Sequence, residues 1–404
     1  MNVPGFDVWS TFVICAIILI ANLAIWRDMR SPAILHSILW TTIIGLFIFV
    51  PHGLFPLREG TYLTVVAAVF VFSLGSVVGY ALVSKLSKTA QWRIPKARPS
   101  VVTAYGLIAL AGLPVFVNKA FELASSNTTG NFLIDIRIKL TESGGSDSFG
   151  NLKYLLPIGF SFYFITIADN SKSLISKKGL GALFVCLAYS ILSTGRTYLF
   201  LLVIPSIFII ALTRRYLFSV RNIALSLAVL VALFTVVGFV YGKIGENPSQ
   251  FFEIFSVYLL GGLGAYDQFC NSNAPGDGDY LYMMRSIYAI QSSMGYPVEV
   301  RPLIMDYSFV PQPTNVYTVF FQYYLDFGIS FVLISQFLFG VVHSALYAAA
   351  RRRNECAIIF YSLSVYPLFI QFFQDQYVTL LSQWVIFSIL IFLPYVLGRS
   401  TRRR

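Results

Sequence analysis

Long apolar runs, separated by short polar segments, extend over most of the chain. About 20 helical residues are needed to cross the ~30 Å hydrocarbon layer of a membrane, and about eleven runs approach that length. They cover residues 8–26, 33–50, 61–83, 101–118, 153–168, 180–193, 198–212, 222–242, 316–349, 357–373 and 379–397. This pattern predicts an all-α polytopic membrane protein, with about eleven transmembrane helices in a single integral membrane domain over residues 1–404.

Composition and charge agree with this interpretation and add an orientation. Hydrophobic residues make up 57% of the 404 residues, charged residues only 12%, and the mean hydropathy is +0.72. Of the 29 Lys and Arg, 20 lie in alternating connections, at 27–31, 84–100, 169–179, 213–221, 350–356 and 398–404. Because basic connections stay in the cytoplasm, we expect an outer N-terminus and a cytoplasmic C-terminus. The net charge of +11 is then a topology signal and does not indicate nucleic-acid binding.

Two long connections, 119–152 and 243–315, are predicted on the outer face. Within the second, Phe251–Cys270 is almost long enough to span, but its insertion would place Arg351–Arg353 outside. We therefore expect an interfacial or re-entrant segment, with a break at Gly261–Gly262.

The first candidate for chemistry is Arg196, which stands between two apolar runs. An Arg at membrane depth is costly unless it is paired or hydrated, so it marks a possible functional site. Gly195 allows a tight turn there, and the hydroxyls of Thr194 and Thr197 could order a phosphate or cap the next helix. The alternative is that Arg196 only anchors a helix end in the lipid headgroups.

The second candidate is Asp326, in the long apolar run that follows Pro311–Asn315. The 34 residues from Val316 to Ala349 would form a helix of about 51 Å, longer than a membrane is thick. Asp326 then falls near the outer interface, with Tyr323 on the same helical face. The alternative is a kink near Gly328, with Asp326 serving as a cap.

Arg285 and Arg301 are further cationic candidates in the outer connection. Arg285 follows the aromatic stretch Tyr280–Met284, which suits stacking on sugars, and an Arg can grip phosphate oxygens with two bonds. Either residue could equally be a solvated loop charge. The three His residues are isolated from one another and no nucleotide-binding motif is present, so we expect neither a metal nor another cofactor.

Three short motifs together resemble the Wzy-type O-antigen polymerases, which polymerise oligosaccharide repeat units. They are Thr194–Thr197, Tyr258–Tyr266, and Thr314–Thr318 followed by Leu325–Gly328. The resemblance covers residues from about 180 to 350, and its strength lies in the order of the motifs. The first 150 residues resemble the family only in being hydrophobic.

This resemblance implies a multi-pass glycosyltransferase of the GT-C type in the bacterial inner membrane, working at its periplasmic face. Its substrates would be oligosaccharides linked to undecaprenyl pyrophosphate, and a chain-length regulator of the Wzz kind is an implied partner. Arg196, Arg285 and Arg301 would stabilise the pyrophosphate leaving group without a metal. Asp326, or otherwise Asp306, would serve as the base or orienting carboxylate. The remaining candidates for substrate binding are Thr194, Thr197, Asn315, Tyr317 and Tyr323.

Other classes of membrane protein remain open. An O-antigen ligase would need a functional His in the large outer loop, and residues 243–315 contain none. A flippase or other transporter would be expected to show internal repeats and cations in several helices, and neither is evident. A structural scaffold is a further alternative, and so is a membrane acyltransferase, for which the candidate residue is His343.

Overall fold

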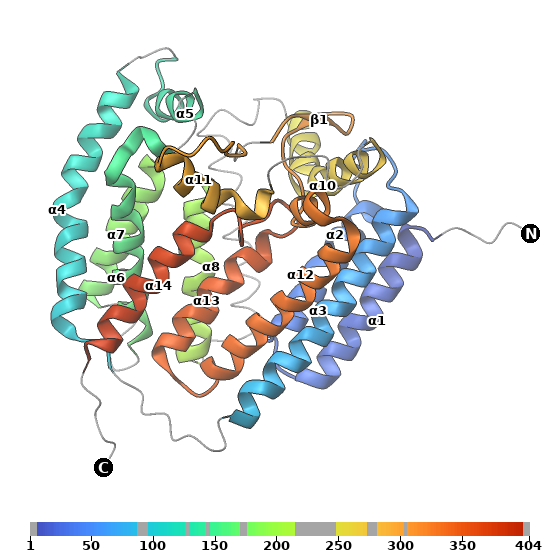
Figure 1. Cartoon of the computed structure of the whole chain (residues 1–404), viewed down its shortest axis with the longest axis horizontal. Coiled ribbons are helices and arrows are strands. Elements are labelled where there is room, and N and C mark those ends of the chain that lie inside the picture. The colour runs from blue at the N-terminus through green and yellow to red at the C-terminus, as the bar shows by residue number, and fades with distance from the viewer. Residues whose placement is uncertain are drawn as a thin grey trace, which may run out of the picture. The chain divides into compact units, whose positions relative to one another are not determined.

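The computed structural model describes residues 6–86, 96–125, 129–142, 146–169, 176–214, 248–272, 281–302 and 305–398. Helices account for nearly all of the regular structure in these ranges (Figure 1). The chain divides into two compact units. Unit 1 comprises residues 1–89, 247–348 and 367–382, and unit 2 comprises residues 90–246, 349–366 and 383–404.

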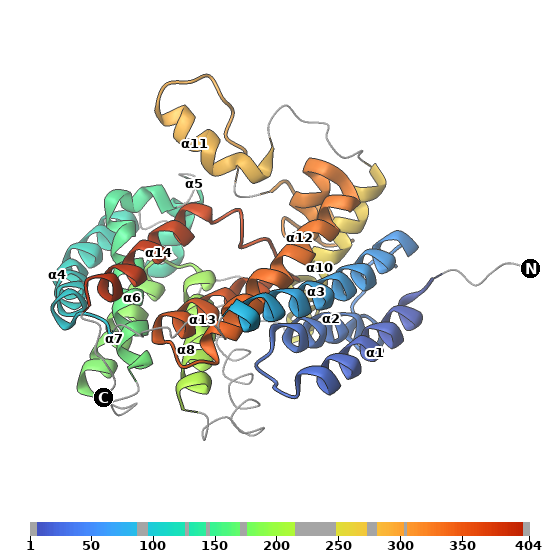
Figure 2. The ribbon, with the colours of Figure 1, turned by 60° about the horizontal axis from the view of Figure 1, so that its bottom comes forward.

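Unit 1 is built around five long helices, α1, α2, α3, α10 and α12, and the segments that join them. Its elements are α1 (Val8–Trp26), α2 (Pro32–Phe49), α3 (Glu59–Leu86), α10 (Pro248–Ser272), η3 (Tyr282–Met284), α11 (Arg285–Ser293), β1 (Ser308–Phe309), β2 (Pro313–Thr314) and nearly all of α12 (Phe320–Ala350). The strands β1 and β2 form a small antiparallel hairpin. Both α11, seen in Figure 2, and the hairpin strand β1, labelled in Figure 1, belong to the stretch of chain that precedes α12.

Unit 2 contains a second group of helices. Its elements are α4 (Pro99–Ala124), α5 (Phe132–Glu142), η1 (Ser146–Tyr154), α6 (Leu155–Ala168), α7 (Lys177–Leu192) and α8 (Arg196–Thr213). The helices α13 (Glu355–Ile370) and α14 (Leu381–Val396) each contribute most of their length to unit 2 and one end to unit 1.

The lengths of these helices are those of a polytopic membrane protein. Six apolar helical stretches among the described residues are long enough to cross a bilayer: Val8–Trp26, Pro32–Phe49, Glu59–Lys85, Pro99–Ala124, Phe149–Ala168 and Phe320–Ala350. Shorter apolar helices cover Thr197–Thr213, Glu355–Ile370 and Leu381–Val396. The run predicted at 222–242 lies outside the described residues, so the count of eleven stays a prediction.

Contacts within unit 1 define two opposite ends. At one end the Phe6 amide donates to Glu59, and the Phe55 amide donates to the Val310 carbonyl, 3.3 Å away. At the other end Tyr347, near the end of α12, donates to Asp28. We call these the loop end and the Asp28 end. The start of α1 thus lies at the same end as the hairpin, as the predicted alternation of sides requires, whereas the absolute orientation stays a prediction.

Glycines bring α3 and α12 into direct backbone contact. Gly75 lies against the backbone of Phe337, and Gly79 lies against that of Val341. The contact partner moves from Phe337 to Val341 as the glycine moves from Gly75 to Gly79, so α3 and α12 run in the same direction. Both views show the two helices side by side (Figures 1 and 2).

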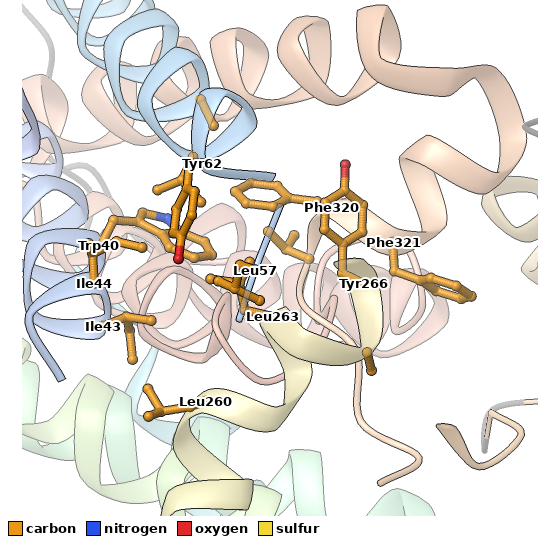
Figure 3. Close-up of a cluster of buried hydrophobic side chains, with 14 of the residues drawn as sticks. Trp40, Ile43, Ile44, Leu57, Tyr62, Leu260, Leu263, Tyr266, Phe320 and Phe321 are labelled. Atoms are coloured by element: carbon orange, nitrogen blue, oxygen red, sulfur yellow. The ribbon is translucent and has the colours of Figure 1, made fainter. Parts of the chain in front are cut away.

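A hydrophobic core connects the helices of unit 1 near the loop end. Trp40 of α2 stacks on Phe320 of α12 with ring centroids 4.7 Å apart, and Tyr266 of α10 meets the same Phe320 ring edge-on. Leu260 and Leu263 of α10 extend this cluster (Figure 3). The amphipathic helix α10 is therefore packed into the protein core by the aromatic start of α12.

Unit 2 has its own core, centred on Phe116 and Tyr189. These buried rings pack edge to face at 4.9 Å, and the Tyr189 hydroxyl donates to the Ala109 carbonyl at 2.7 Å. Large apolar side chains such as Leu107 and Phe184 are exposed on the outside of the same helices. Exposed apolar surface of this kind suits contact with lipid.

Two local predictions are corrected by the structure. First, α10 continues through Gly261–Gly262 without a break. A side chain at Gly262 would collide with the backbone of Phe372. These glycines serve close packing. Second, the helix expected directly after Asn315 begins only at Phe320 and is not continuous, because it is interrupted at Gly328.

The late start of α12 has a physical cause. The amide of Thr318 donates to the Gly262 carbonyl at 3.2 Å, and the amide of Val319 donates to the Gln371 carbonyl at 2.8 Å. Tertiary partners thus satisfy backbone groups that a longer helix would otherwise have used.

Candidate functional site

Asp326 holds the start of the 281–301 segment through both of its carboxylate oxygens. Oδ1 accepts a hydrogen bond from the Tyr282 amide and Oδ2 accepts one from the Met283 amide, each at 2.9 Å. Asp326 is only 6% exposed, and a buried carboxylate is tolerated when it is hydrogen-bonded in this way. The carboxylate therefore caps η3, which leads directly into α11.

The interruption of α12 lies two residues beyond this carboxylate. Gly328 has φ 75° and ψ −169°, a conformation that a residue with a side chain rarely adopts. The sequence left open the alternative of a kink near Gly328 with Asp326 as a cap, and the structure contains both a kink and a cap at these residues. The cap, however, serves the loop segment at 282–284.

Arg285 and Arg301 both lie on the segment that Asp326 holds. The Arg285 Nε donates to the Arg301 carbonyl at 2.7 Å, which ties the two ends of the α11 segment together. The Arg301 guanidinium stands over the Tyr282 ring, 5.6 Å from its centroid, and interacts electrostatically with Asp326. The structure thus brings three predicted residues, Asp326, Arg285 and Arg301, to one place.

Aromatic side chains and two further candidates surround this cluster. Tyr317 stacks on Phe321 with ring centroids 4.2 Å apart, and the Phe321 ring lies 6.5 Å from that of Tyr282. The Tyr317 hydroxyl donates to the Asp306 carbonyl at 3.1 Å, while Asp306 itself is exposed.

Burial raises the pKa of both Tyr282 and Tyr317. Their hydroxyls are therefore neutral donors at neutral pH. Asn315, by contrast, is half-buried directly after the hairpin strand β2.

Tyr323 belongs to a different group of contacts. Its buried hydroxyl donates to Asp375 Oδ1 at 3.0 Å. Asp375 also accepts hydrogen bonds from the amides of Tyr377, Val378 and Thr379, at 3.1, 3.1 and 2.9 Å, and from the Thr379 hydroxyl at 2.9 Å. Sequence reasoning missed Asp375, although the polar stretch Gln374–Gln376 between two apolar runs marked a connection.

The Thr194–Thr197 motif lies in unit 2, at the junction of α7 and α8. Thr194 is buried and has φ 50°, whereas Gly195 has φ −89°. The turn expected at Gly195 is thus made by Thr194, and Gly195 instead leaves room for the Tyr198 ring. Thr197 hydrogen-bonds to Tyr366 of α13.

Arg196 is the first residue of α8, and its side chain lies outside the described residues. The predicted convergence of Arg196 with Asp326 therefore stays a prediction. Among the described residues, no group of three or more His, Cys, Asp or Glu side chains could hold a metal ion.

Comparison with known proteins gives low identity over nearly the whole chain. The chain is 21% identical over 369 residues to an O-antigen polymerase of Shigella dysenteriae, which covers 89% of this chain and 90% of that protein. It is 22% identical over 393 residues to a putative O-antigen polymerase of Escherichia coli (strain K12), which covers 93% and 94%. No family model and no solved structure matches. The chain is thus similar over about nine tenths of its length to proteins named for O-antigen polymerisation.

Proposed function

We propose that this chain is a glycosyltransferase of the bacterial inner membrane that polymerises oligosaccharide repeat units at the periplasmic face. Its substrates are repeat units linked to undecaprenyl pyrophosphate, and its product is O-antigen or a related surface polysaccharide. The similarity to two O-antigen polymerases over about nine tenths of each chain carries this proposal. The gathering of Asp326, Arg285 and Arg301 on one membrane helix and its preceding loop supports it.

The reaction requires cations at the leaving group. The hydroxyl of the acceptor sugar forms a bond to the anomeric carbon of the donor, and the bond from that carbon to the pyrophosphate oxygen breaks. The pyrophosphate keeps the electron pair, and its growing negative charge is stabilised by arginines. We assign this task to Arg285 and Arg301, with Arg196 as a third cation.

The carboxylates take separate tasks in this proposal. Both Asp326 oxygens already accept backbone hydrogen bonds, so taking a proton at either oxygen would cost one of these bonds. We therefore assign Asp326 to orienting the arginine-bearing segment. The exposed carboxylate of Asp306 is the candidate base that takes the proton of the acceptor hydroxyl.

Aromatic and hydroxyl groups complete the proposed binding surface. Tyr317 and Tyr282 offer ring faces and neutral hydroxyls to sugars, and Asn315 adds an amide two positions before Tyr317. Thr194 and Thr197 are assigned to the phosphate side together with Arg196. A chain-length regulator of the Wzz kind is the proposed protein partner.

A strain that lacks this gene tests the function directly. We expect its lipopolysaccharide or capsule ladder to collapse to a single repeat unit, and expression of the wild-type chain to restore long polymers. Loss of every attached unit would instead indicate a ligase or a flippase. Arg285→Gln should shorten the polymer, whereas the control Arg27→Gln, at the other end of unit 1, should restore wild-type lengths at equal membrane levels.

A further inference from the structure

A second polar cluster lies inside unit 1 and takes no part in the proposed reaction. It joins His36 and Trp40 of α2, His343 of α12, and Gln371 and Tyr377 of the segment that follows α13. Three of these side chains, His36, Trp40 and Gln371, are fully buried, and His343 is 1% exposed. Both His residues belong to helices long and apolar enough to span the membrane.

Close polar contacts connect the two imidazoles through one amide and one phenol. His36 Nε2 lies 3.0 Å from Gln371 Oε1, and Trp40 Nε1 donates to His36 Nε2 at 3.1 Å. Gln371 Nε2 donates to the Tyr377 hydroxyl at 3.2 Å, and that hydroxyl lies 2.9 Å from His343 Nε2. The protein groups thus account for the Nε2 atom of each imidazole.

Among the residues that the structure describes, the other imidazole nitrogens have no protein partner. Nδ1 of His36 and Nδ1 of His343 are buried and make no hydrogen bond, and the same holds for both amide atoms of Gln336. Gln336 lies near His36 on the facing helix α12, but without the geometry of a hydrogen bond. The Ser344 hydroxyl, next to His343, is likewise buried and unpaired.

The two imidazoles lie close to one another in unit 1, and Gln336 lies near His36. The His36 ring stacks on Phe72 with centroids 3.9 Å apart, and the His343 ring lies 6.0 Å from the same Phe72. Every neutral imidazole has one donor and one acceptor nitrogen, so either tautomer leaves Nδ1 unsatisfied. Leaving such groups bare in an apolar interior costs free energy, and native proteins satisfy them with ordered water.

We propose that unit 1 binds internal water molecules between α2, α12 and the segment 371–377, and that this water links His36, Gln336 and His343. Each water molecule needs two to four polar partners, and the two Nδ1 atoms and the Gln336 amide supply them. The water gives the two imidazoles a route for proton exchange that the protein groups alone do not provide. This inference is independent of the proposed function.

Radiolytic hydroxyl-radical footprinting in lipid nanodiscs tests for this water, because radicals formed from bound water oxidise the side chains beside it. We expect Trp40 and His343 to be oxidised many-fold faster than Tyr189, which is equally buried but lies in the unit 2 core. In ¹⁸O-labelled water the added oxygen should carry the label. Oxidation of Trp40 and His343 at the Tyr189 rate would overturn the proposal.

The variant Gln336→Leu gives a second test whose sign differs between a hydrated and a dry interior. In a dry interior the substitution removes two unpaired polar atoms and should raise Tm. In a hydrated interior it removes ligands of the water, so it should lower Tm and reduce oxidation of Trp40. Ile334→Leu, which changes an exposed side chain of the same helix, is the control. A raised Tm for Gln336→Leu refutes the inference.

Discussion

Replacing Asp326 by Asn tests how firmly this side chain holds the 281–301 segment. The carboxylate accepts two amide hydrogen bonds at 2.9 Å and faces the charge of Arg301. An Asn side chain keeps one acceptor oxygen but turns an NH₂ group toward the other amide. The variant therefore loses one charge-assisted hydrogen bond outright and the charge on the second.

A hydrogen bond to a charged group contributes about 1.5–3 kcal/mol. Since 1.4 kcal/mol corresponds to a tenfold change in an equilibrium constant, opening of the segment should become roughly 10- to 150-fold more frequent. Amide hydrogen exchange, followed by mass spectrometry on the purified protein, measures this opening at Tyr282 and Met283. We expect their protection to fall by that factor and the polymer to shorten.

Asp306→Asn is the matched control, because Asp306 is exposed and the 281–301 segment is held by Asp326 instead. It should leave the protection of Tyr282 and Met283 unchanged, although it should reduce polymerisation if Asp306 is the base. Unchanged protection in Asp326→Asn would refute the anchoring argument. Full-length polymer despite lost protection would separate Asp326 from the reaction.

Three further predictions concern single residues. Arg301→Lys keeps the charge but loses the flat guanidinium over Tyr282, so ladders should shorten while membrane levels stay normal. Burial opposes ionisation of Asp28, but hydrogen bonds from Arg30 and Tyr347 outweigh it and lower its pKa. The stability gained is present above the unfolded pKa and lost as pH falls through the folded value, so Asp28→Asn should lower Tm at pH 7 and hardly at pH 3. Gly340→Val should cost at least about 1–3 kcal/mol by forcing α12 from the Phe72 backbone, which chemical unfolding would detect, whereas Gly60→Ala should be tolerated.

The sequence predicted those helices that depend only on local pattern. The run 8–26 coincides with α1, which is capped by Asp7 and Ser10 at its start and ended by Arg27 in a left-handed conformation. Each of these signals lies within a few residues of the helix end. The alternation of charge likewise anticipated that the start of α1 and the hairpin share one end of unit 1.

The predictions that failed depended on partners distant in the sequence. Nothing near Thr318 reveals that its amide donates to Gly262, and nothing near Gly262 reveals that Phe372 occupies the space of a side chain there. An uninterrupted apolar run predicts a continuous helix, although Gly328 was visible as a point where a kink could form. Asp375 was missed for the same reason, because its importance comes from Tyr323, 52 positions away.

The two hydrogen bonds that Asp326 accepts link these observations to the proposed chemistry. A carboxylate in a continuous membrane helix would find few donors, because the helix amides around it are already bonded to one another. The amides that Asp326 does bind come from the start of η3, where backbone donors have no partner in their own helix. The charge of Asp326 is thus satisfied by the segment that carries Arg285, and holding that segment brings the arginines to the loop end of a membrane helix. Burial of the carboxylate and placement of the cations are therefore two consequences of the same pair of hydrogen bonds.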